Sequence, residues 1–345
     1  MAKQTTQTTT TQDDTIYIGC DDGFAATDIV VIHGNSVITE LCIPSRARAG
    51  VHGTTVIGTG GDKGLVPCYE SEGVQFTVES DLADAESARF ADYPFSAMNR
   101  VIVSHALRLA GMGGKDVRIA TGLPLSMFYK GDKPNAEVIS RKDASLRTAV
   151  RALDGSPTAN IIQHAVYPEG LAAWIDHALD ANLNMRIEGD ETYGVIDVGG
   201  RTTDCAVVMP GQRVDHARCG SAEVGVLNVV EHLRVSLLKK LGFEFTGSQI
   251  ENALRTGSVK VFGKQQSIED EIAEAVAQVE DSIQREVNRR FGSAHDIDHM
   301  LLVGGGAHIF KGILQRYPNV TIPEKPEFAN ARGFAKFLKM SSATN

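Results

Sequence analysis

Short apolar runs that end near glycine alternate along this chain with longer stretches in which apolar residues recur every three or four positions. The short runs, such as Ile29–Ile32 and Met300–Val303, predict buried strands. Helical spacing is clearest over Ser267–Phe291 and over Leu227–Leu241, where Gly242 marks the end of the apolar stripe. Strands and helices that alternate in this way favour an α/β fold.

Two strand-turn-strand segments repeat each other at an offset of 176 positions, the distance from Asp21 to Asp197. In each segment an apolar strand runs into a tight glycine turn, and a second apolar strand follows. The residues that coincide in register are Asp21 and Asp197, Gly23 and Gly199, Thr27 and Thr203, and Asp28 and Asp204. The repeat predicts a duplicated α/β core, in which two aspartate-bearing hairpins face each other across a cleft.

A third glycine turn, Gly304, Gly305 and Gly306, follows the predicted strand Met300–Val303. Glycine lets the backbone approach a ligand closely, and a helix that begins at about His308 would favour a phosphate or a ribose-linked group. The chain contains neither the G-x-G-x-x-G pattern of dinucleotide-binding folds nor the G-x-x-x-x-G-K-[ST] pattern of Walker loops. Both of those nucleotide-binding folds are therefore disfavoured.

Two aspartate-bearing glycine turns suit a polyphosphate, which the exposed backbone amides of both turns would bind. Because carboxylates repel phosphate, Asp21 and Asp197 are candidates for holding Mg²⁺, often through water, while the metal bridges phosphate oxygens. Each aspartate taken singly is more typical of turn capping, and the pair in register reverses that preference. Glu169 is a candidate for orienting or deprotonating an attacking water, although a Pro-Glu pair is also ordinary at a helix start.

Charge and cysteine content narrow the function classes. The 345 residues carry 34 Lys and Arg against 43 Asp and Glu, and the net charge of −9 argues against direct binding to nucleic acid. Five scattered cysteines lack zinc-ligand spacing and are expected to be reduced. No apolar run approaches the ~18–20 residues that span a bilayer, so no membrane association is expected. The Thr- and Gln-rich residues 1–14 are expected to form a disordered tail.

The paired aspartate-glycine hairpins and the late glycine turn resemble the actin/Hsp70/sugar-kinase superfamily, in which the hairpins bind phosphates and the late glycines flank adenosine. Within it, the chain is more similar to the ParM/StbA family of plasmid-segregation actin-like ATPases. That similarity covers about residues 15–340 and is carried by Pro44-Ser45, Tyr93–Asn99, His105–Leu107, Asp116-Val117, Thr121–Tyr129 and Lys130–Lys142. The block Leu123-Pro124-Leu125 and its surroundings are more specific than the glycine motifs.

The resemblance implies a duplicated, two-lobed, actin-like (ribonuclease-H-like) α/β fold with a nucleotide cleft between the lobes. Lobe I would comprise residues 15–189 and a returning C-terminal helix at 327–340. Lobe II would comprise residues 190–326.

The resemblance also assigns roles by position. It places Asp21, Gly23, Phe24 and Ala25 in a first phosphate loop, Asp197, Gly199, Gly200, Arg201 and Thr202 in a second, and Gly304, Gly305 and Gly306 at the adenosine, with Glu169 and Asp197 as catalytic residues. The first loop departs from the family pattern, which has small hydroxyl residues after its glycine and then a lysine. This chain has Phe24, Ala25 and Asp28 at those places. Arg201 or backbone amides are candidates to replace the missing phosphate contacts.

The function implied by the resemblance is a bacterial, cytoplasmic ATPase that binds ATP or GTP with Mg²⁺ and polymerises with copies of itself. Hydrolysis would destabilise the filament, and filaments would segregate plasmid DNA through a DNA-bound adaptor protein. Three alternatives stay open, namely a cell-shape or division filament, a small-molecule kinase of the same superfamily, and an Hsp70-like chaperone. A cell-shape filament usually contacts membrane through an amphipathic terminus, which neither end of this chain resembles.

Overall fold

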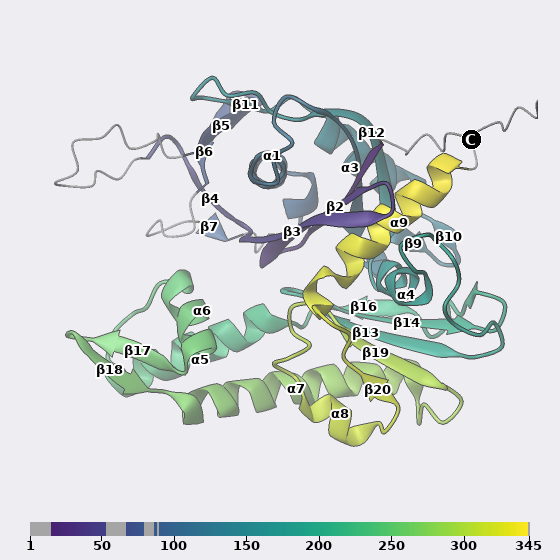
Figure 1. Cartoon of the computed structure of the whole chain (residues 1–345). Coiled ribbons are helices and arrows are strands. Elements are labelled where there is room, and N and C mark those ends of the chain that lie inside the picture. The colour runs from purple at the N-terminus through teal and green to yellow at the C-terminus, as the bar shows by residue number, and fades with distance from the viewer. Residues whose placement is uncertain (1–14, 53–66, 79–85, 88–89, 344–345) are drawn as a thin grey trace, which may run out of the picture.

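The computed structural model describes residues 15–52, 67–78, 86–87 and 90–343. Figure 1 shows two lobes, each with a mixed sheet and helices packed against it. The tail expected at residues 1–14 lies outside the described residues. The lobe boundaries near residues 189 and 326 stay predictions.

The main sheet of lobe I has the strand order β12-β8-β1-β2-β3. Its strands are β1 (Ile16–Asp22), β2 (Ala26–His33), β3 (Ser36–Pro44), β8 (Asp116–Leu123) and β12 (Asn160–Pro168). β1 pairs antiparallel with β2 and parallel with β8. The interiors of β1 and β2 are buried almost without interruption, as expected for strands covered on both faces.

The sheet of lobe II has the strand order β15-β14-β13-β19-β20, and β16 also pairs with β14. Its strands are β13 (Tyr193–Val198), β14 (Thr203–Met209), β15 (Arg213–Val214), β16 (Gly220–Ala222), β19 (His299–Val303) and β20 (Val320–Thr321). As in lobe I, the first strand of the hairpin pairs antiparallel with its successor and parallel with a later strand, here β19.

The duplication read from the sequence is confirmed by the strand register. Asp21 is paired with Asp28 across β1 and β2, and Asp197 is paired with Asp204 across β13 and β14. The two hairpins therefore have the same register at the same distance from their turns. Residues of both turns line one cavity between the lobes.

Smaller elements extend both lobes. Lobe I carries a second sheet, ordered β11-β5-β6-β4-β7, and the pair β9-β10, whereas lobe II carries the pair β17-β18. These strands are β4 (Arg46–Ala49), β5 (Cys68–Ser71), β6 (Val74–Thr77), β7 (Glu86–Ser87), β9 (Tyr129–Lys130), β10 (Lys133–Pro134), β11 (Arg151–Ala152), β17 (Ser258–Val261) and β18 (Lys264–Ser267). In Figure 1 the β17-β18 hairpin and the β4–β7 region lie at the same end of the molecule.

Most of the helices pack on the two main sheets, whereas α6 packs on α5 and β17. They are η1 (Tyr93–Phe95), α1 (Ala97–Leu109), α2 (Leu125–Phe128), α3 (Ala136–Arg147), α4 (Leu171–Ala178), α5 (Val226–Leu241), α6 (Gly247–Thr256), α7 (Glu269–Phe291), α8 (Gly312–Arg316), η2 (Pro326–Phe328) and α9 (Ala329–Ala343).

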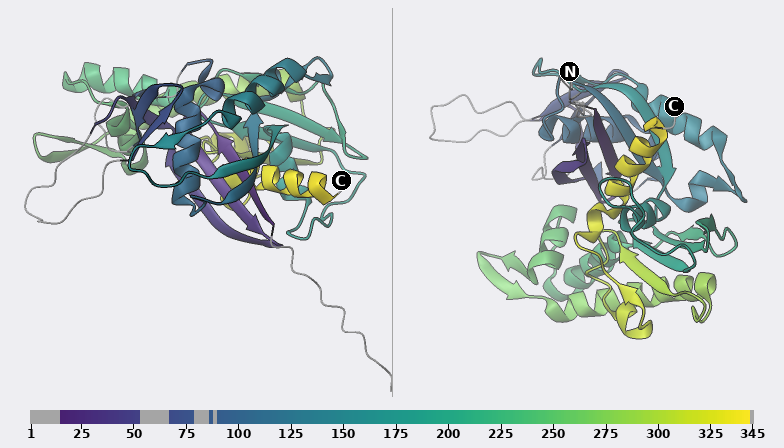
Figure 2. Two further views of the ribbon diagram at one scale, coloured as in Figure 1. Left: turned by 90° about the horizontal axis from the view of Figure 1, so that it is seen from above. Right: turned by 45° about the vertical axis from the view of Figure 1, so that its right-hand side comes forward.

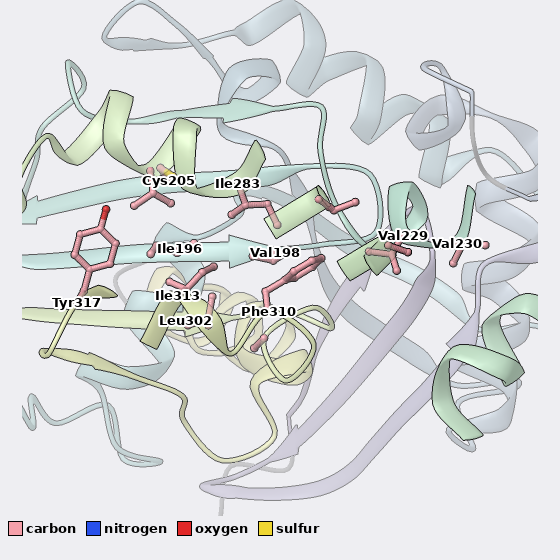
Figure 3. Packing of buried hydrophobic residues seen from close by; sticks show 14 of the residues in the cluster. Ile196, Val198, Cys205, Val229, Val230, Ile283, Leu302, Phe310, Ile313 and Tyr317 are labelled. Atoms are coloured by element: carbon pink, nitrogen blue, oxygen red, sulfur yellow. The ribbon is translucent and has the colours of Figure 1, made fainter. Parts of the chain in front are cut away.

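The two helices predicted from apolar spacing are confirmed as α5 and α7. Gly242 adopts a left-handed φ of 75° and ends α5, as the stripe indicated. Acidic residues occupy the first turn of α7 and arginines its last turn, which complements the helix dipole. Figure 3 shows the core that these helices form with the lobe II sheet, where side chains such as Ile196, Val230 and Ile283 are buried together.

The C-terminal helix α9 returns to lobe I, and Figures 1 and 2 show it in yellow against the purple N-terminal strands. Ala331, Phe334 and Leu338 of α9 are buried in one cluster with Val30 of β2. The contact is so close at Gly19 of β1 that an added Cβ would overlap the backbone of α9. α9 thereby begins at the cleft and runs along the lobe I sheet.

Candidate functional site

A cavity of about 520 Å³ lies between the lobes, at the turns of both duplicated hairpins. Nearly all the residues proposed from the sequence line it. They are Asp21, Gly23, Phe24, Ala25, Glu169, Asp197, Gly199, Gly200, Arg201, Thr202, Gly304 and Gly305. The fold therefore brings these residues together, while the role of each stays a prediction.

Gly306 is the exception among the sequence-proposed residues, because it does not line the cavity. Its amide donates to the carbonyl of Val198 at 2.9 Å, so it packs the third glycine turn against β13. The helix expected from about His308 is also wrong. Residues 305–309 form turns, and α8 begins only at Gly312. Gly304 has a left-handed φ of 84°, and a Cβ there would lie 2.5 Å from Asp197 Oδ1, so this position requires glycine.

The two hairpin turns are in contact. A Cβ added to Gly200 would lie 2.5 Å from the Ala25 Cβ, so only glycine allows this approach. The first turn is held from β3, since the Ser45 hydroxyl donates to the Gly23 carbonyl at 2.7 Å and the Ser45 amide donates to the Ala25 carbonyl at 3.0 Å. Ser45 belongs to a motif noted in the sequence, but the sequence did not reveal this role.

Phe24, for which the resemblance predicts a hydroxyl residue, packs inward. Its ring lies 5.6 Å from the Tyr93 ring, centroid to centroid, and the side chain is buried. The guanidinium carbon of Arg201, from the opposite turn, lies 5.4 Å from the Phe24 ring centroid. A cation is therefore present at the cavity wall beside the first turn, and it comes from lobe II.

The second turn is anchored to the start of α5. The amides of Val226 and Leu227 donate to the carbonyls of Gly199 and Gly200 at 3.1 Å and 2.8 Å. These are amides that a helix start leaves without an intrahelical partner. The positive end of the α5 dipole thus lies directly behind the second turn, which favours an anion in the cavity.

Asn330, in the first turn of α9, joins the two candidate metal ligands. Its Nδ2 donates to Asp197 Oδ2 at 2.7 Å and to Asp21 Oδ2 at 3.2 Å, while its Oδ1 accepts from the Gly170 amide at 3.0 Å. The sequence interpretation missed this residue. No local pattern could have found it, because its partners lie 133 to 309 positions away.

The cleft carboxylates raise one another's proton affinity. Burial, followed by the nearby charge of Asp28, raises the pKa of Asp21 to about 7. Burial and then the charges of Asp21 and Asp204 raise the pKa of Asp197 to about 8. Burial raises the pKa of Glu169 well above its ordinary value, and Asp21 adds to that shift. This clustering of negative charge would be relieved by a bound cation.

These carboxylates fit a magnesium ion that takes most of its ligands from water and phosphate. Among the described residues, no three His, Cys, Asp or Glu side chains form a ready metal-ligand group. Asp21 and Asp197, held side by side by Asn330, supply the two hard oxygen donors typical of such a site.

A lysine does lie beside the first turn, but it is not among the residues that line the cavity. Lys142 of α3 is fully buried and forms an ion pair with Asp22. Its Nζ also donates to the Pro94 carbonyl at 2.9 Å. Asn99 donates to the same oxygen of Asp22 at 2.7 Å.

Part of the cavity wall is apolar. It is formed by Val226, Leu227 and Val230 of α5, Leu254 of α6, and Ile309 after the glycine turn. Arg46 of β4 and Glu251 of α6 form an ion pair that links the two lobes, and Glu251 lines the cavity. An apolar pocket next to a polyphosphate cradle suits a nucleoside.

No helix in the described ranges is long and apolar enough to cross a bilayer.

Comparisons with known proteins agree with this geometry. The N-terminal family model of the plasmid segregation protein ParM matches residues 16–179, and the C-terminal model of the archaeal MreB-like actin homologue matches residues 195–316. No curated protein matches the chain.

Solved structures match over nearly the whole chain. The archaeal actin homologue Ta0583 in complex with ADP is 19% identical, with a TM-score of 0.74 over 94% of this chain and 99% of that one. A 15-stranded ParM filament from Clostridium botulinum is 17% identical, with a TM-score of 0.73 over 95% and 99%. Bacillus thuringiensis ParM with AMPPNP is 13% identical, with a TM-score of 0.63 over 95% and 99%. The actin-like, two-lobed fold is thereby confirmed.

Proposed function

We propose that this chain, a ParM-like member of the actin-like proteins, is a nucleoside triphosphatase that forms filaments with bound nucleotide and disassembles after hydrolysis. The observation that carries the proposal is the contact between two duplicated Asp-Gly hairpin turns over a carboxylate-lined interlobe cavity. A ParM filament and complexes with ADP and AMPPNP among the similar structures support it.

The chemistry follows from the cavity wall. Backbone amides of the two turns would bind the phosphates, with the α5 dipole behind the second turn. Asp21 and Asp197 would hold Mg²⁺, which supplies neutralisation of the phosphate oxygens. Glu169 would accept the proton of the attacking water, because burial and the neighbouring carboxylates raise its pKa. The nucleoside would occupy the apolar part of the cavity, where ATP and GTP are both candidates.

We further propose that the filaments segregate plasmid DNA through a DNA-bound adaptor protein in a bacterial cytoplasm. The ParM model over residues 16–179 supports this role. The net charge of −9 makes a protein adaptor the more favourable route to DNA.

A second candidate is a cytoskeletal filament with no plasmid cargo. The archaeal MreB-like model over residues 195–316 and the likeness to Ta0583 favour it. The two candidates differ in whether an adaptor is required, so filaments that recruit plasmid DNA only when a centromere-binding protein is added would favour the first.

Sedimentation and light scattering with ATP, GTP, ADP and AMPPNP test the central proposal. We expect pelleting with triphosphate and Mg²⁺ that reverses as the triphosphate is consumed, and persistent pelleting with AMPPNP. A chain that stays in the supernatant at high concentration with every nucleotide would contradict filament formation. Turnover without pelleting, stimulated by a small hydroxylated substrate, would point to a kinase.

Glu169→Gln should bind nucleotide and form filaments that outlive those of the wild-type chain. Removing a general base slows hydrolysis by about 10²- to 10⁴-fold. Phosphate release and filament lifetime measure this effect. The matched control is Glu137→Gln, an exposed position in the first turn of α3, which should leave both rates unchanged. Rapid hydrolysis by the Glu169 variant would remove this residue from its proposed role.

A further inference from the structure

One buried amide contacts three separate parts of the cleft. Asn330 is 4% exposed, and it bonds Asp21 of β1, Asp197 of β13 and the amide of Gly170. Gly170 directly follows Glu169, the candidate base. The side chain therefore touches the metal-ligand candidate of each lobe and also the turn that carries the proposed base.

The chemistry of the three partners fixes which way round the amide lies. A backbone amide only donates hydrogen bonds, so the Gly170 amide must meet the carbonyl oxygen of Asn330. The NH₂ group must therefore face Asp21 and Asp197, and the carbonyl oxygen must face Gly170. Asparagine is neutral, so it bonds both carboxyl groups without adding a third acid to the cluster, as an aspartate there would.

Helix α9, which carries Asn330, is bonded to α4, the helix that follows Glu169 and Gly170. Lys336 of α9 donates to Asp176 Oδ1 at 2.8 Å and to the Leu179 carbonyl at 2.7 Å, and Arg332 donates to Asp176 Oδ2 at 2.7 Å. Asp176 lies on α4, the helix that starts after Gly170. α4 and α9 are thus tied together, and Asn330 links this pair of helices to β13 in lobe II.

We propose that Asn330 is a positioning residue that sets the separation of Asp21 and Asp197 and orients the Glu169–Gly170 turn. The inference rests on the proposed function of the cleft and deepens it. Binding of Mg²⁺ with nucleotide and placement of the attacking water then depend on one side chain, which lines the cavity and bonds both candidate metal ligands. Asn330 couples the two lobes at the point where the triphosphate is cleaved.

The test compares Asn330→Leu and Asn330→Ala with Asn319→Ala. Asn319 donates to the Ile297 carbonyl at 2.7 Å in lobe II, away from the residues that line the cavity. The Mg²⁺ concentration for half-maximal binding of a fluorescent ADP should rise about 10- to 100-fold in the Asn330 variants, as is usual when a residue behind metal ligands is lost. kcat at saturating Mg²⁺ and nucleotide should also fall, while ADP binding in EDTA should stay unchanged.

A purely structural role would lower the melting temperature without changing the Mg²⁺ requirement, which is the pattern expected of Asn319→Ala. Asn330 variants that need no more Mg²⁺ than this control would overturn the proposal.

Hydrogen exchange of the nucleotide-free chain provides an independent measurement. The segment 169–175 should exchange about tenfold faster in Asn330→Leu than in the wild type, because the Gly170 amide loses its acceptor. Exchange that is unchanged would also overturn the positioning role. If the wild-type chain bound no nucleotide, the proposed function would fail. Hydrogen exchange would still show whether Asn330 stabilises the Glu169–Gly170 turn.

Discussion

Lys142 and Asp22 form an ion pair whose side chains are only 1% and 2% exposed. The change to test is Lys142→Met, which keeps the length of the side chain and removes its charge. Asp22 would then keep the hydrogen bond from Asn99 but lose its counter-charge. Breaking a buried ion pair by removing one partner costs about 3–5 kcal/mol, because the remaining charge stays buried without compensation.

A loss of about 3–5 kcal/mol is a large fraction of the unfolding free energy expected of one lobe. For a domain of this size, each kcal/mol corresponds to roughly 2–4 °C in Tm, so Lys142→Met should lower Tm by roughly 6–20 °C. The double variant Asp22→Asn, Lys142→Met removes both charges and should recover much of the loss. The coupling free energy between the two positions should be at least about 2 kcal/mol.

The neighbouring position provides a matched control. Arg141 pairs with Asp92 at 3.0 Å on the surface, where the side chains are 55% and 72% exposed. Arg141→Met should cost at most about 1 kcal/mol. Thermal unfolding followed by circular dichroism compares the variants. If Lys142→Met and Arg141→Met melt within about 2 °C of each other, the argument from burial is wrong. The argument would also be wrong if the double variant lost as much stability as the sum of the losses of the two single variants.

Three further predictions concern the cleft itself. Arg201→Ala should weaken nucleotide binding by about 10- to 100-fold, the value of a charge-assisted hydrogen bond to phosphate, and unchanged affinity in a fluorescence titration would refute it. Glu251→Ala breaks the ion pair to Arg46 between the lobes and should speed nucleotide release about two- to fivefold in a stopped-flow chase; equal or slower release would exclude a closing role. Raised pKa values of about 7 for Asp21 and about 8 for Asp197 mean that the folded chain binds protons more tightly than the unfolded chain. In EDTA, Tm should therefore fall as pH rises from about 4 to about 8. Mg²⁺ with nucleotide should reduce this loss of Tm. A Tm that rises over that pH range would contradict the raised pKa values of Asp21 and Asp197.

The duplicated hairpins could be predicted because their signal is local. Asp21 and Gly23 lie two positions apart, and the flanking apolar residues fix the strand register within each copy. The helix expected after the glycine turn was wrong, because backbone contacts such as the Gly306–Val198 hydrogen bond fold that segment into turns instead.

The contacts that hold the site together could not be predicted. Lys142 meets Asp22 across 120 positions and Asn330 meets Asp21 across 309, and only the folded topology brings such residues together. The sequence identified the residues of the glycine turns that line the cleft, and it missed Asn330 and the residues of the apolar wall.

The two halves of the repeat have diverged at the aspartate of the second strand. In lobe II, Asp204 Oδ1 accepts from the Leu125 amide at 2.7 Å and from the Ser221 hydroxyl at 2.5 Å, so it ties the two lobes together. In lobe I, Asp28 lines the cavity, and its Oδ1 has no hydrogen-bond partner among the described residues. Burial raises the pKa of Asp28 to about 7.

The resemblance predicts a lysine at the position of Asp28, whereas the first hairpin of this chain presents an acid to the cavity. A bound polyphosphate would then be repelled from lobe I, unless Mg²⁺ and Arg201 offset the negative charges of the phosphates and of Asp28. Arg201, which also pairs with Glu223 at 3.3 Å, provides one such cation from lobe II, beside Phe24 of lobe I. Nucleotide binding should consequently depend more steeply on Mg²⁺ and on closure of the lobes than in a relative whose first turn carries its own lysine. Replacing Asp28 by lysine should therefore lower the Mg²⁺ requirement.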